Sequence, residues 1–185
     1  MNSNKTSSKG NNVCHGPGLV QVYTGNGKGK TTAALGLCLR AVGAGWRVLV
    51  VQFMKGQDTS ELAALQMLGC QVETRRYGAG RLVRKPTLED RAAARLGLSE
   101  AAVLLKCGDF QLVVLDEANM AVHHQLFSID ELLAAVDGRA AHTEVAITGR
   151  NAHPQLLAKA DLVTEMREVK HYYKKGVAAR TGAEF

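Results

Sequence analysis

A glycine-rich segment, TGNGKGKTT at residues 24–32, constrains the fold of this chain more than any other feature. It follows a short apolar, β-rich run at 19–23 and precedes small and apolar residues at helical spacing over 31–45. A glycine loop between a strand and a helix exposes backbone N–H groups beside the positive end of the helix dipole, and both attract an anion. The sequence therefore predicts a phosphate-binding loop, here called the phosphate loop.

The spacing of this loop differs by one residue from the usual pattern G-x-x-x-x-G-K-[ST]. Measured back from Gly29, the first glycine position holds Thr24, and Gly25 comes one residue later. Lys30 and Thr31 keep their register, the lysine for phosphate oxygens and the threonine hydroxyl for magnesium. A turn that only connects strand and helix is the alternative, but it gives Lys30 and Thr31 no packing role. The predicted nucleotide-binding residues in the loop are Thr24, Gly25, Asn26, Gly27, Lys28, Gly29, Lys30, Thr31 and Thr32.

Beyond the phosphate loop, apolar strand-like runs alternate with stretches of helical spacing. The continuous apolar runs at 46–53 and 110–116 are typical of strands that are covered on both faces. The alternation predicts a single α/β domain with a P-loop NTPase-like fold, in which a mostly parallel sheet carries helices on both faces. The other predicted strands are 70–77, a weak one, 143–149 and 161–166; the predicted helices are 59–68, 87–106 with Gly97 as a potential break, 129–136 and 153–159.

The first sixteen residues differ in composition from the rest of the chain. They are rich in Ser, Asn, Lys and Gly and nearly free of apolar residues, so they bury too little surface to offset the entropy lost on ordering. We expect residues 1–16 to form a flexible arm and residues 17–185 to form the domain.

Two acidic residues end the clearest predicted strand. Asp116 and Glu117 follow the apolar run at 110–115, and the carboxyl end of a buried parallel strand lies beside the nucleotide crevice. There the carboxylates can hold magnesium directly or through water. Alternatively, the two acids only cap the strand. Taken with the phosphate loop, they predict binding of ATP or GTP with Mg²⁺ through Thr31, Glu117 and Asp116.

The net charge of +6 and the pI near 9.3 suggest nucleic-acid binding at first sight. The surplus is local, however, because residues 75–85 contain five basic residues and no acidic one. Base-stacking proteins interleave aromatic residues with basic ones, and this segment has only Tyr77. The sequence therefore argues against a nucleic-acid partner. It contains neither a membrane-spanning apolar run nor paired cysteines, so we expect a cytoplasmic protein.

Several motifs in consistent order identify a family resemblance. The runs TGNGKGKTTAALG, VVQFMKG, VVLDEAN and ITGR, and the C-terminal block ADLVTEMREVKHYYKKGVAARTGAEF, resemble the P-loop ATP:corrinoid adenosyltransferases from about residue 18 to 185. The one-residue difference in glycine spacing belongs to the pattern of that family. The resemblance implies transfer of the 5′-deoxyadenosyl group of ATP to the Co(I) centre of a reduced corrinoid, with release of triphosphate.

The resemblance also implies partners and site residues. It suggests a homodimer, an electron-donating reductase, Lys30 as the group that neutralises triphosphate charge, and Arg40 as a further nucleotide contact or a solvated helix residue. No protein nucleophile is required, because the corrinoid cobalt supplies the electron pair. Lys170 and His171, in the C-terminal block, face the active site or a dimer partner, or else are structural, and His123 and His124 are interpreted as surface or packing residues.

The chain departs from well-known family members in one loop. In those members, aromatic residues after the third strand displace the lower ligand of the corrinoid. Here Arg81 and Val83 occupy the corresponding positions, and only Tyr77 lies nearby. The corrinoid-side candidates are therefore Tyr77, Arg81 and Val83, with Arg84 and Lys85 as contacts to corrinoid side groups or simply solvated residues. The acceptor is either a complete cobalamin or an incomplete corrinoid without the lower ligand.

Two other functions share part of this pattern. A different P-loop enzyme, an ATPase or a nucleoside kinase, would have the phosphate loop and the acidic pair but no need for the C-terminal block. A kinase would also carry a catalytic acid or an arginine finger in a recognisable place, and none is identifiable. An ATP-dependent nucleic-acid-binding module rests only on the pI. We therefore expect the corrinoid adenosyltransferase.

Overall fold

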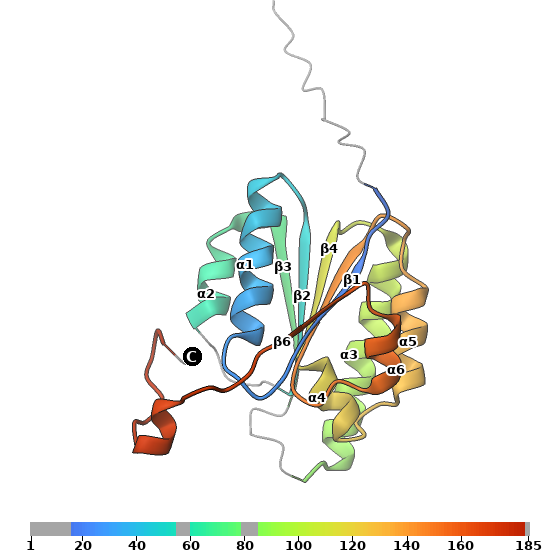
Figure 1. Cartoon of the computed structure of the whole chain (residues 1–185). Helices are drawn as coiled ribbons and strands as arrows, with labels where there is room; N and C mark the ends of the chain where they lie inside the picture. Colours follow the sequence, from blue (N-terminus) through green and yellow to red (C-terminus); the bar gives the residue numbers. More distant parts are fainter. Residues whose placement is uncertain (1–15, 55–59, 79–84, 184–185) are drawn as a thin grey trace, which may run out of the picture.

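The computed structural model describes residues 16–54, 60–78 and 85–183. Six strands form one parallel sheet in the order β3-β2-β4-β5-β1-β6 (Figure 1). The order places β4 and β5 at the centre and β6, the last strand in the chain, beside β1. The strands are β1 (Val20–Thr24), β2 (Val48–Phe53), β3 (Val72–Tyr77), β4 (Leu112–Asp116), β5 (Glu144–Thr148) and β6 (Leu162–Glu165).

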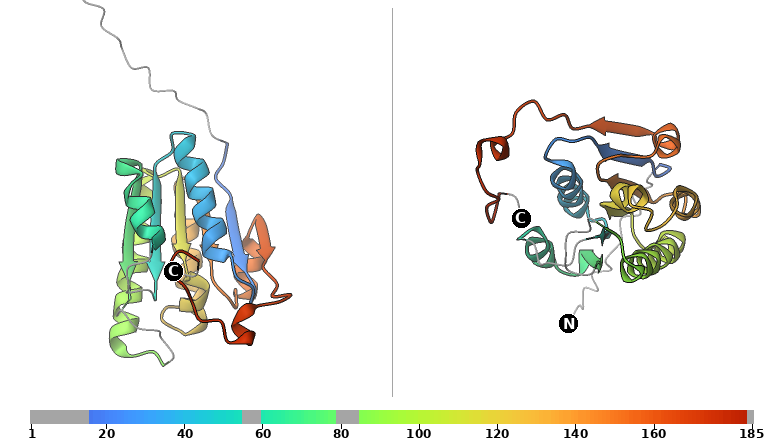
Figure 2. Two further views of the ribbon diagram at one scale, coloured as in Figure 1. Left: turned by 90° about the vertical axis from the view of Figure 1, so that its left-hand side faces the viewer. Right: turned by 90° about the horizontal axis from the view of Figure 1, so that it is seen from below.

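Helices cover both faces of the sheet, as predicted (Figure 2). On one face α1 (Lys30–Gly43) and α2 (Ser60–Gln66) pack on β2 and β4. The opposite face packs against the remaining α-helices. These are α3 (Leu88–Cys107), α4 (Ala118–His123), α5 (Ile129–Asp137) and α6 (Pro154–Lys159); short 3₁₀ turns, η1 and η2, span Gly69–Gln71 and Tyr172–Lys175. The α/β fold with a P-loop NTPase-like arrangement is confirmed.

Two predictions about helices were wrong or incomplete. Helix α3 runs without a break through Gly97, because this glycine is required for packing and not for a turn. A Cβ atom at Gly97 would lie 2.4 Å from Cγ of Tyr77, so the ring of Tyr77 sits directly on the helix backbone. Helix α4 was not predicted as an element, since it starts immediately after β4 with Glu117 as its N-cap. The flexible arm predicted for residues 1–16 lies, except for Gly16, outside the described residues.

Two helix-interior glycines allow a matched stability test. We expect Gly97→Ala to lower the free energy of unfolding by about 1–3 kcal/mol, because the new methyl group overlaps the Tyr77 ring. Gly36→Ala in α1 is expected to raise it by about 0.5–1 kcal/mol, because nothing lies within 4 Å of its Cβ position and alanine favours helix. Urea unfolding of both variants measures the difference. Equal effects of the same sign would contradict the packing role of Gly97.

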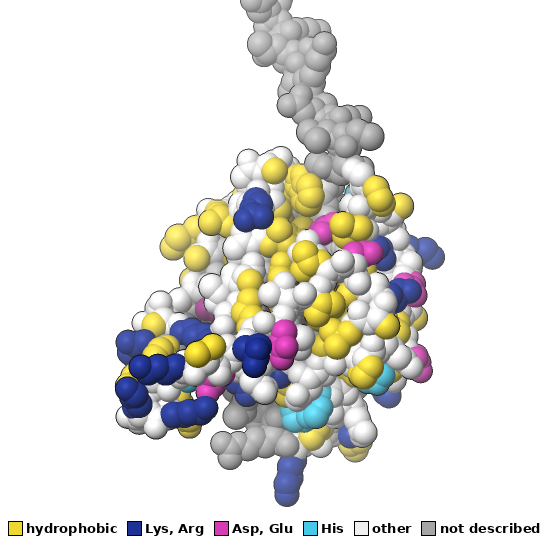
Figure 3. Space-filling model, viewed as in Figure 1, with side chains coloured by type: hydrophobic (Ala, Val, Ile, Leu, Met, Phe, Trp, Pro, Cys, Tyr) yellow, Lys and Arg dark blue, Asp and Glu magenta, His cyan; other side chains and the backbone are white. Residues whose placement is uncertain are grey.

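The strand β6 is the least covered part of the sheet. Its four residues are all exposed, and it lies at an edge of the sheet. Successive strand residues point to opposite faces, yet Leu162 and Val163 are 43% and 46% exposed. Hydrophobic side chains gather on the molecular face that carries β6 (Figure 3).

No helix in the described ranges is long and apolar enough to cross a membrane.

Candidate functional site

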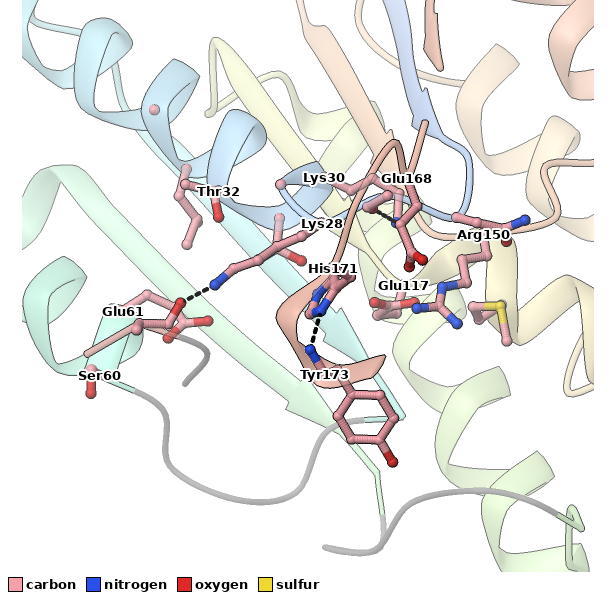
Figure 4. A pocket seen from close by; sticks show the side chains of 18 of the residues that line it. Lys28, Lys30, Thr32, Ser60, Glu61, Glu117, Arg150, Glu168, His171 and Tyr173 are labelled. Carbon is pink, nitrogen blue, oxygen red and sulfur yellow. Dashed lines mark hydrogen bonds between the residues drawn. The ribbon is translucent and has the colours of Figure 1, made fainter. Parts of the chain in front are cut away.

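A pocket of about 1390 Å³ opens at the carboxyl ends of the central strands. Parallel topology brings these ends together, so loops that are distant in sequence share one edge of the sheet. The phosphate loop forms one wall, and Glu117 and Met120 after β4 form another. Residues of the C-terminal tail, defined here as 166–183, close the pocket on the outer side (Figure 4). The structure thus brings the phosphate loop and Glu117, one of the two predicted acids, together around one pocket.

The phosphate loop leads directly into α1, whose first residue is Lys30. Gly29 adopts φ 117° and Gly25 φ 93°, a left-handed region that favours glycine. The start of α1 has no side-chain cap and no acidic residue in its first turn. Because Asn26 to Thr32 line the pocket, the uncapped, positive end of the α1 dipole borders that space.

The loop glycines are also required by the chain that follows β6. The Gly27 amide donates to the Met166 carbonyl at 2.6 Å, and the Met166 amide donates to the Thr24 carbonyl at 2.8 Å. A Cβ at Gly25 or Gly27 would lie 2.5 or 2.7 Å from that Met166 oxygen. The backbone at Met166 therefore fixes the shape of the phosphate loop, a contact that connects residues about 140 positions apart.

Lys30 is held against its own loop. Its Nζ atom donates to the carbonyls of Gly25 at 2.8 Å and Gly27 at 2.7 Å, and the residue is 8% exposed. Burial lowers the pKa of Lys30, the positive charge of Arg150 lowers it further, and the charge of Glu117 opposes both. The ammonium group of Lys30 is thus held at the phosphate loop, and Lys30 lines the pocket.

Asp116 is fully buried and holds three side chains around it. Its Oδ1 accepts hydrogen bonds from the hydroxyls of Thr31 at 2.8 Å and Thr148 at 2.6 Å, and its Oδ2 accepts from the Gln52 amide at 3.1 Å. Glu117 follows with φ 62° and lines the pocket. The structure thus places the predicted Mg²⁺ residues Thr31, Asp116 and Glu117 next to one another.

This donor set fits Mg²⁺. A hydroxyl and carboxylates supply the oxygen ligands that Mg²⁺ prefers, and the ion usually keeps waters and shares substrate phosphates instead of using an all-protein cage. Within the described ranges, no group of three or more His, Cys, Asp or Glu residues is arranged to hold a metal ion. The observed set, one hydroxyl and two acids beside a phosphate loop, suits an ion that takes its remaining ligands from phosphate oxygens and water.

The C-terminal tail lies across the phosphate loop. Lys28 donates from Nζ to the Tyr172 hydroxyl at 3.1 Å and to the Ala183 carbonyl, and it also lies 5.8 Å from the centre of the Tyr172 ring. Lys174 pairs with Glu168, and this pairing holds the pKa of Glu168 below its usual value. Lys28, predicted to contact nucleotide, is thus engaged by the tail in this conformation.

Two predicted contacts are not brought to the pocket. Arg40 is exposed in the last turn of α1, roughly 15 Å along the helix from Lys30, and does not line the pocket. Tyr77 packs its ring on Gly97, and its hydroxyl donates to Glu100, so it is occupied on the α3 side. Arg81, Val83 and Arg84 lie outside the described residues, and Lys85 is exposed.

Several pocket residues were missed by sequence reasoning. His124, interpreted as a surface or packing residue, lines the pocket, while His123 lines a smaller second pocket. Burial lowers the pKa of His124. His171 also lines the pocket, and its Nδ1 accepts a hydrogen bond from the Tyr173 amide at 3.1 Å, which caps η2. Other missed pocket residues follow the carboxyl ends of β2, β4, β5 and β6 and include Met54, Met120, Arg150, Glu168 and Tyr173.

Comparison with known proteins agrees with this geometry. A family model described as "ATP:corrinoid adenosyltransferase BtuR/CobO/CobP" matches residues 17–185. A corrinoid adenosyltransferase of Pseudomonas aeruginosa is 41% identical over 170 residues, which cover 91% of this chain and 84% of the relative. The corrinoid adenosyltransferase CobA of Salmonella typhimurium is 37% identical over 169 residues, covering 91% and 86%. A corrinoid adenosyltransferase of Sinorhizobium sp. is 36% identical over 174 residues, covering 91% and 80%.

Proposed function

Because this chain belongs to the ATP:corrinoid adenosyltransferase family, which uses ATP to adenosylate corrinoids, we propose that the pocket at the phosphate loop binds the triphosphate of ATP. The observation that carries this proposal is the uncapped start of α1 together with Lys30, whose ammonium group lies against the loop. Backbone N–H groups and a stored positive charge suit the most highly charged part of ATP.

The reaction places its main demand on the leaving group. The Co(I) centre of the corrinoid substrate attacks C5′ of ATP, a cobalt–carbon bond forms, and the C5′–O bond breaks to release triphosphate with its electron pair. The chain therefore needs no nucleophile or general base. Its residues align C5′ with cobalt and stabilise the charge that develops on triphosphate, which makes Lys30 the central residue.

We propose that Thr31, Asp116 and Glu117 hold Mg²⁺ beside the triphosphate. The ion would supply positive charge to the phosphate oxygens. Thr31 presents its hydroxyl from the first turn of α1, and Asp116 accepts a hydrogen bond from that hydroxyl at 2.8 Å. Glu117 lines the pocket and has room for its carboxylate there, because Gly149 has no side chain to fill the space 3.3 Å from Glu117 Oε2.

The experiment that tests the function combines the protein with ATP, Mg²⁺ and a chemically reduced corrinoid. We expect the absorption spectrum to change as a cobalt–carbon bond forms, and triphosphate to appear in equal amount. Omitting the corrinoid should stop ATP consumption. Release of orthophosphate or formation of a phosphorylated acceptor, without adenosylated corrinoid, would support an ATPase or a kinase instead.

We also propose that the protein is a homodimer that works in the cytoplasm, with a reductase supplying the electron that reduces the corrinoid cobalt to Co(I). The uncovered strand β6 supports the dimer, because its two faces leave Leu162 and Val163 half exposed at the sheet edge. Val163→Glu is expected to give monomers in light scattering after size exclusion. Val103→Glu, at a 62% exposed position of α3, is the matched control and should leave the dimer intact. Monomers for the unchanged protein would contradict the dimer.

A further inference from the structure

Thr148 ends β5 beside the two acidic residues. In the parallel register Ile147 lies opposite Leu115, so the next residues, Thr148 and Asp116, lie side by side at the carboxyl ends of β5 and β4. Thr148 is completely buried. Its Oγ1 donates to Asp116 Oδ1 at 2.6 Å and accepts from the backbone amide of Glu117 at 3.0 Å. One hydroxyl group therefore contacts both acids of the predicted metal site.

The direction of these hydrogen bonds is fixed by chemistry. A hydroxyl can donate one hydrogen bond, and the Glu117 amide can only donate, so Thr148 donates its hydrogen bond to Asp116. Thr31 also donates its hydroxyl hydrogen bond to Asp116 Oδ1, so the lone pairs of the Thr31 oxygen are left for a cation or a phosphate-bound water. The orientation of the Thr31 oxygen thus depends on where Asp116 is held.

Both neighbours of β4 hold Asp116 in place. From β5, Thr148 holds Oδ1, and from β2, Gln52 donates its amide to Oδ2 at 3.1 Å. Gln52 lies directly opposite Asp116 in the register and is fully buried. Its Oε1 atom finds no hydrogen-bond partner among the described residues, so this oxygen can accept one further hydrogen bond. The carboxylate is therefore fixed at both oxygens.

Glu117 needs a support of its own. Its φ of 62° is uncommon for a residue with a side chain, and its side chain makes no hydrogen bond that caps the start of α4. The Thr148 hydroxyl accepts its amide hydrogen and so favours this backbone conformation. That conformation places Glu117 in the pocket lining.

We propose that Thr148 is a positioning residue for the metal–triphosphate site. It orients Asp116, and through it the Thr31 oxygen, and it also holds the backbone of Glu117. Metal ligands in proteins depend in this way on outer residues that fix their orientation. The inference rests on the proposed Mg²⁺-ATP site.

The test compares Thr148→Val, which removes the hydroxyl at nearly constant volume, with Thr148→Ser, which keeps it. The matched control is Thr143→Val, immediately before the same strand, where another fully buried hydroxyl donates to the Phe110 carbonyl at 3.0 Å. Calorimetric titration gives the Kd for ATP with Mg²⁺ and with EDTA, and thermal unfolding reports stability.

We expect Thr148→Val to reduce the Mg²⁺-dependent gain in ATP affinity about tenfold, because losing a group that orients a metal ligand typically weakens metal binding by at least this factor. Thr148→Ser should retain the gain within about twofold, and Thr143→Val should lose stability while keeping the gain. If the valine variant does not fold, Thr148→Ala removes the same hydroxyl and gives the same comparison.

The outcomes separate the two proposals. A full Mg²⁺ gain in Thr148→Val, equal to that of Thr143→Val, would show that Thr148 is only structural and overturn this inference while the ATP site stands. If the unchanged protein binds ATP equally well with Mg²⁺ and with EDTA, the metal site itself is wrong, and the role of Thr148 falls with it.

Discussion

Lys30→Met is expected to weaken ATP binding about 100-fold and to reduce adenosyl transfer at least as much. Hydrogen bonds to charged groups contribute about 1.5–3 kcal/mol each, and 2.7 kcal/mol corresponds to roughly 100-fold in Kd. Methionine keeps most of the length of the chain that is buried beside Gly25 and Gly27 but removes the charge. Titration with ATP, followed by the spectral assay at saturating ATP, separates binding from transfer.

Lys28→Met serves as the comparison for this prediction. Lys28 lies in the same loop, but its ammonium group contacts the Tyr172 hydroxyl and the tail. We expect its effect on ATP affinity to stay below about tenfold, because it supplies a single charge-assisted contact at an exposed position. Equal losses in the two variants would show that general loop charge, and not the placement of Lys30, governs binding.

Gly27→Ala is expected to lower ATP affinity about 100-fold by a different cause. The new methyl group would lie 2.7 Å from the Met166 carbonyl oxygen and 2.9 Å from the Arg167 carbonyl carbon. Because both are backbone atoms, either the phosphate loop or the C-terminal tail must move. Amide hydrogen exchange without ATP should rise at Met166 and in the tail, and calorimetry should show the loss of affinity.

Gly36→Ala is the control for this variant, because it adds the same methyl group in the pocket lining where nothing lies within 4 Å. It should leave exchange in the tail unchanged. Slow exchange at Met166 combined with lost ATP binding in Gly27→Ala would indicate that the glycine serves only the phosphates. Normal ATP binding by Gly27→Ala would contradict both the proposed displacement of the loop or tail and a direct role of Gly27 at the phosphates.

Local patterns in the sequence predicted the parts of the site that local structure determines. The loop from Thr24 to Thr32 and the acids after β4 were located because a strand, a turn and a helix follow one another within a few residues. The parallel sheet followed from the alternation of apolar runs. The structure brings Thr31 and Asp116 within 2.8 Å, although 85 positions separate them.

Long-range packing determined what the sequence could not predict. Nothing local to Gly97 shows that Tyr77, twenty positions earlier, needs its space, so the glycine suggested a helix break. Arg40 does not line the pocket although Leu39 beside it does, because successive helix residues point in different directions. His124 and Arg150 enter the pocket through strand order, which a single sequence does not contain.

The contact between Gly27 and Met166 also sets the order in which this enzyme is completed during its synthesis. The phosphate loop is translated well before Met166, which follows the last strand of the sheet. At about 5–20 residues per second, the roughly 140 residues between them take about 7–28 s to be translated. A nascent chain therefore carries the loop sequence long before β6 can pair with β1 and Met166 can contact Gly27.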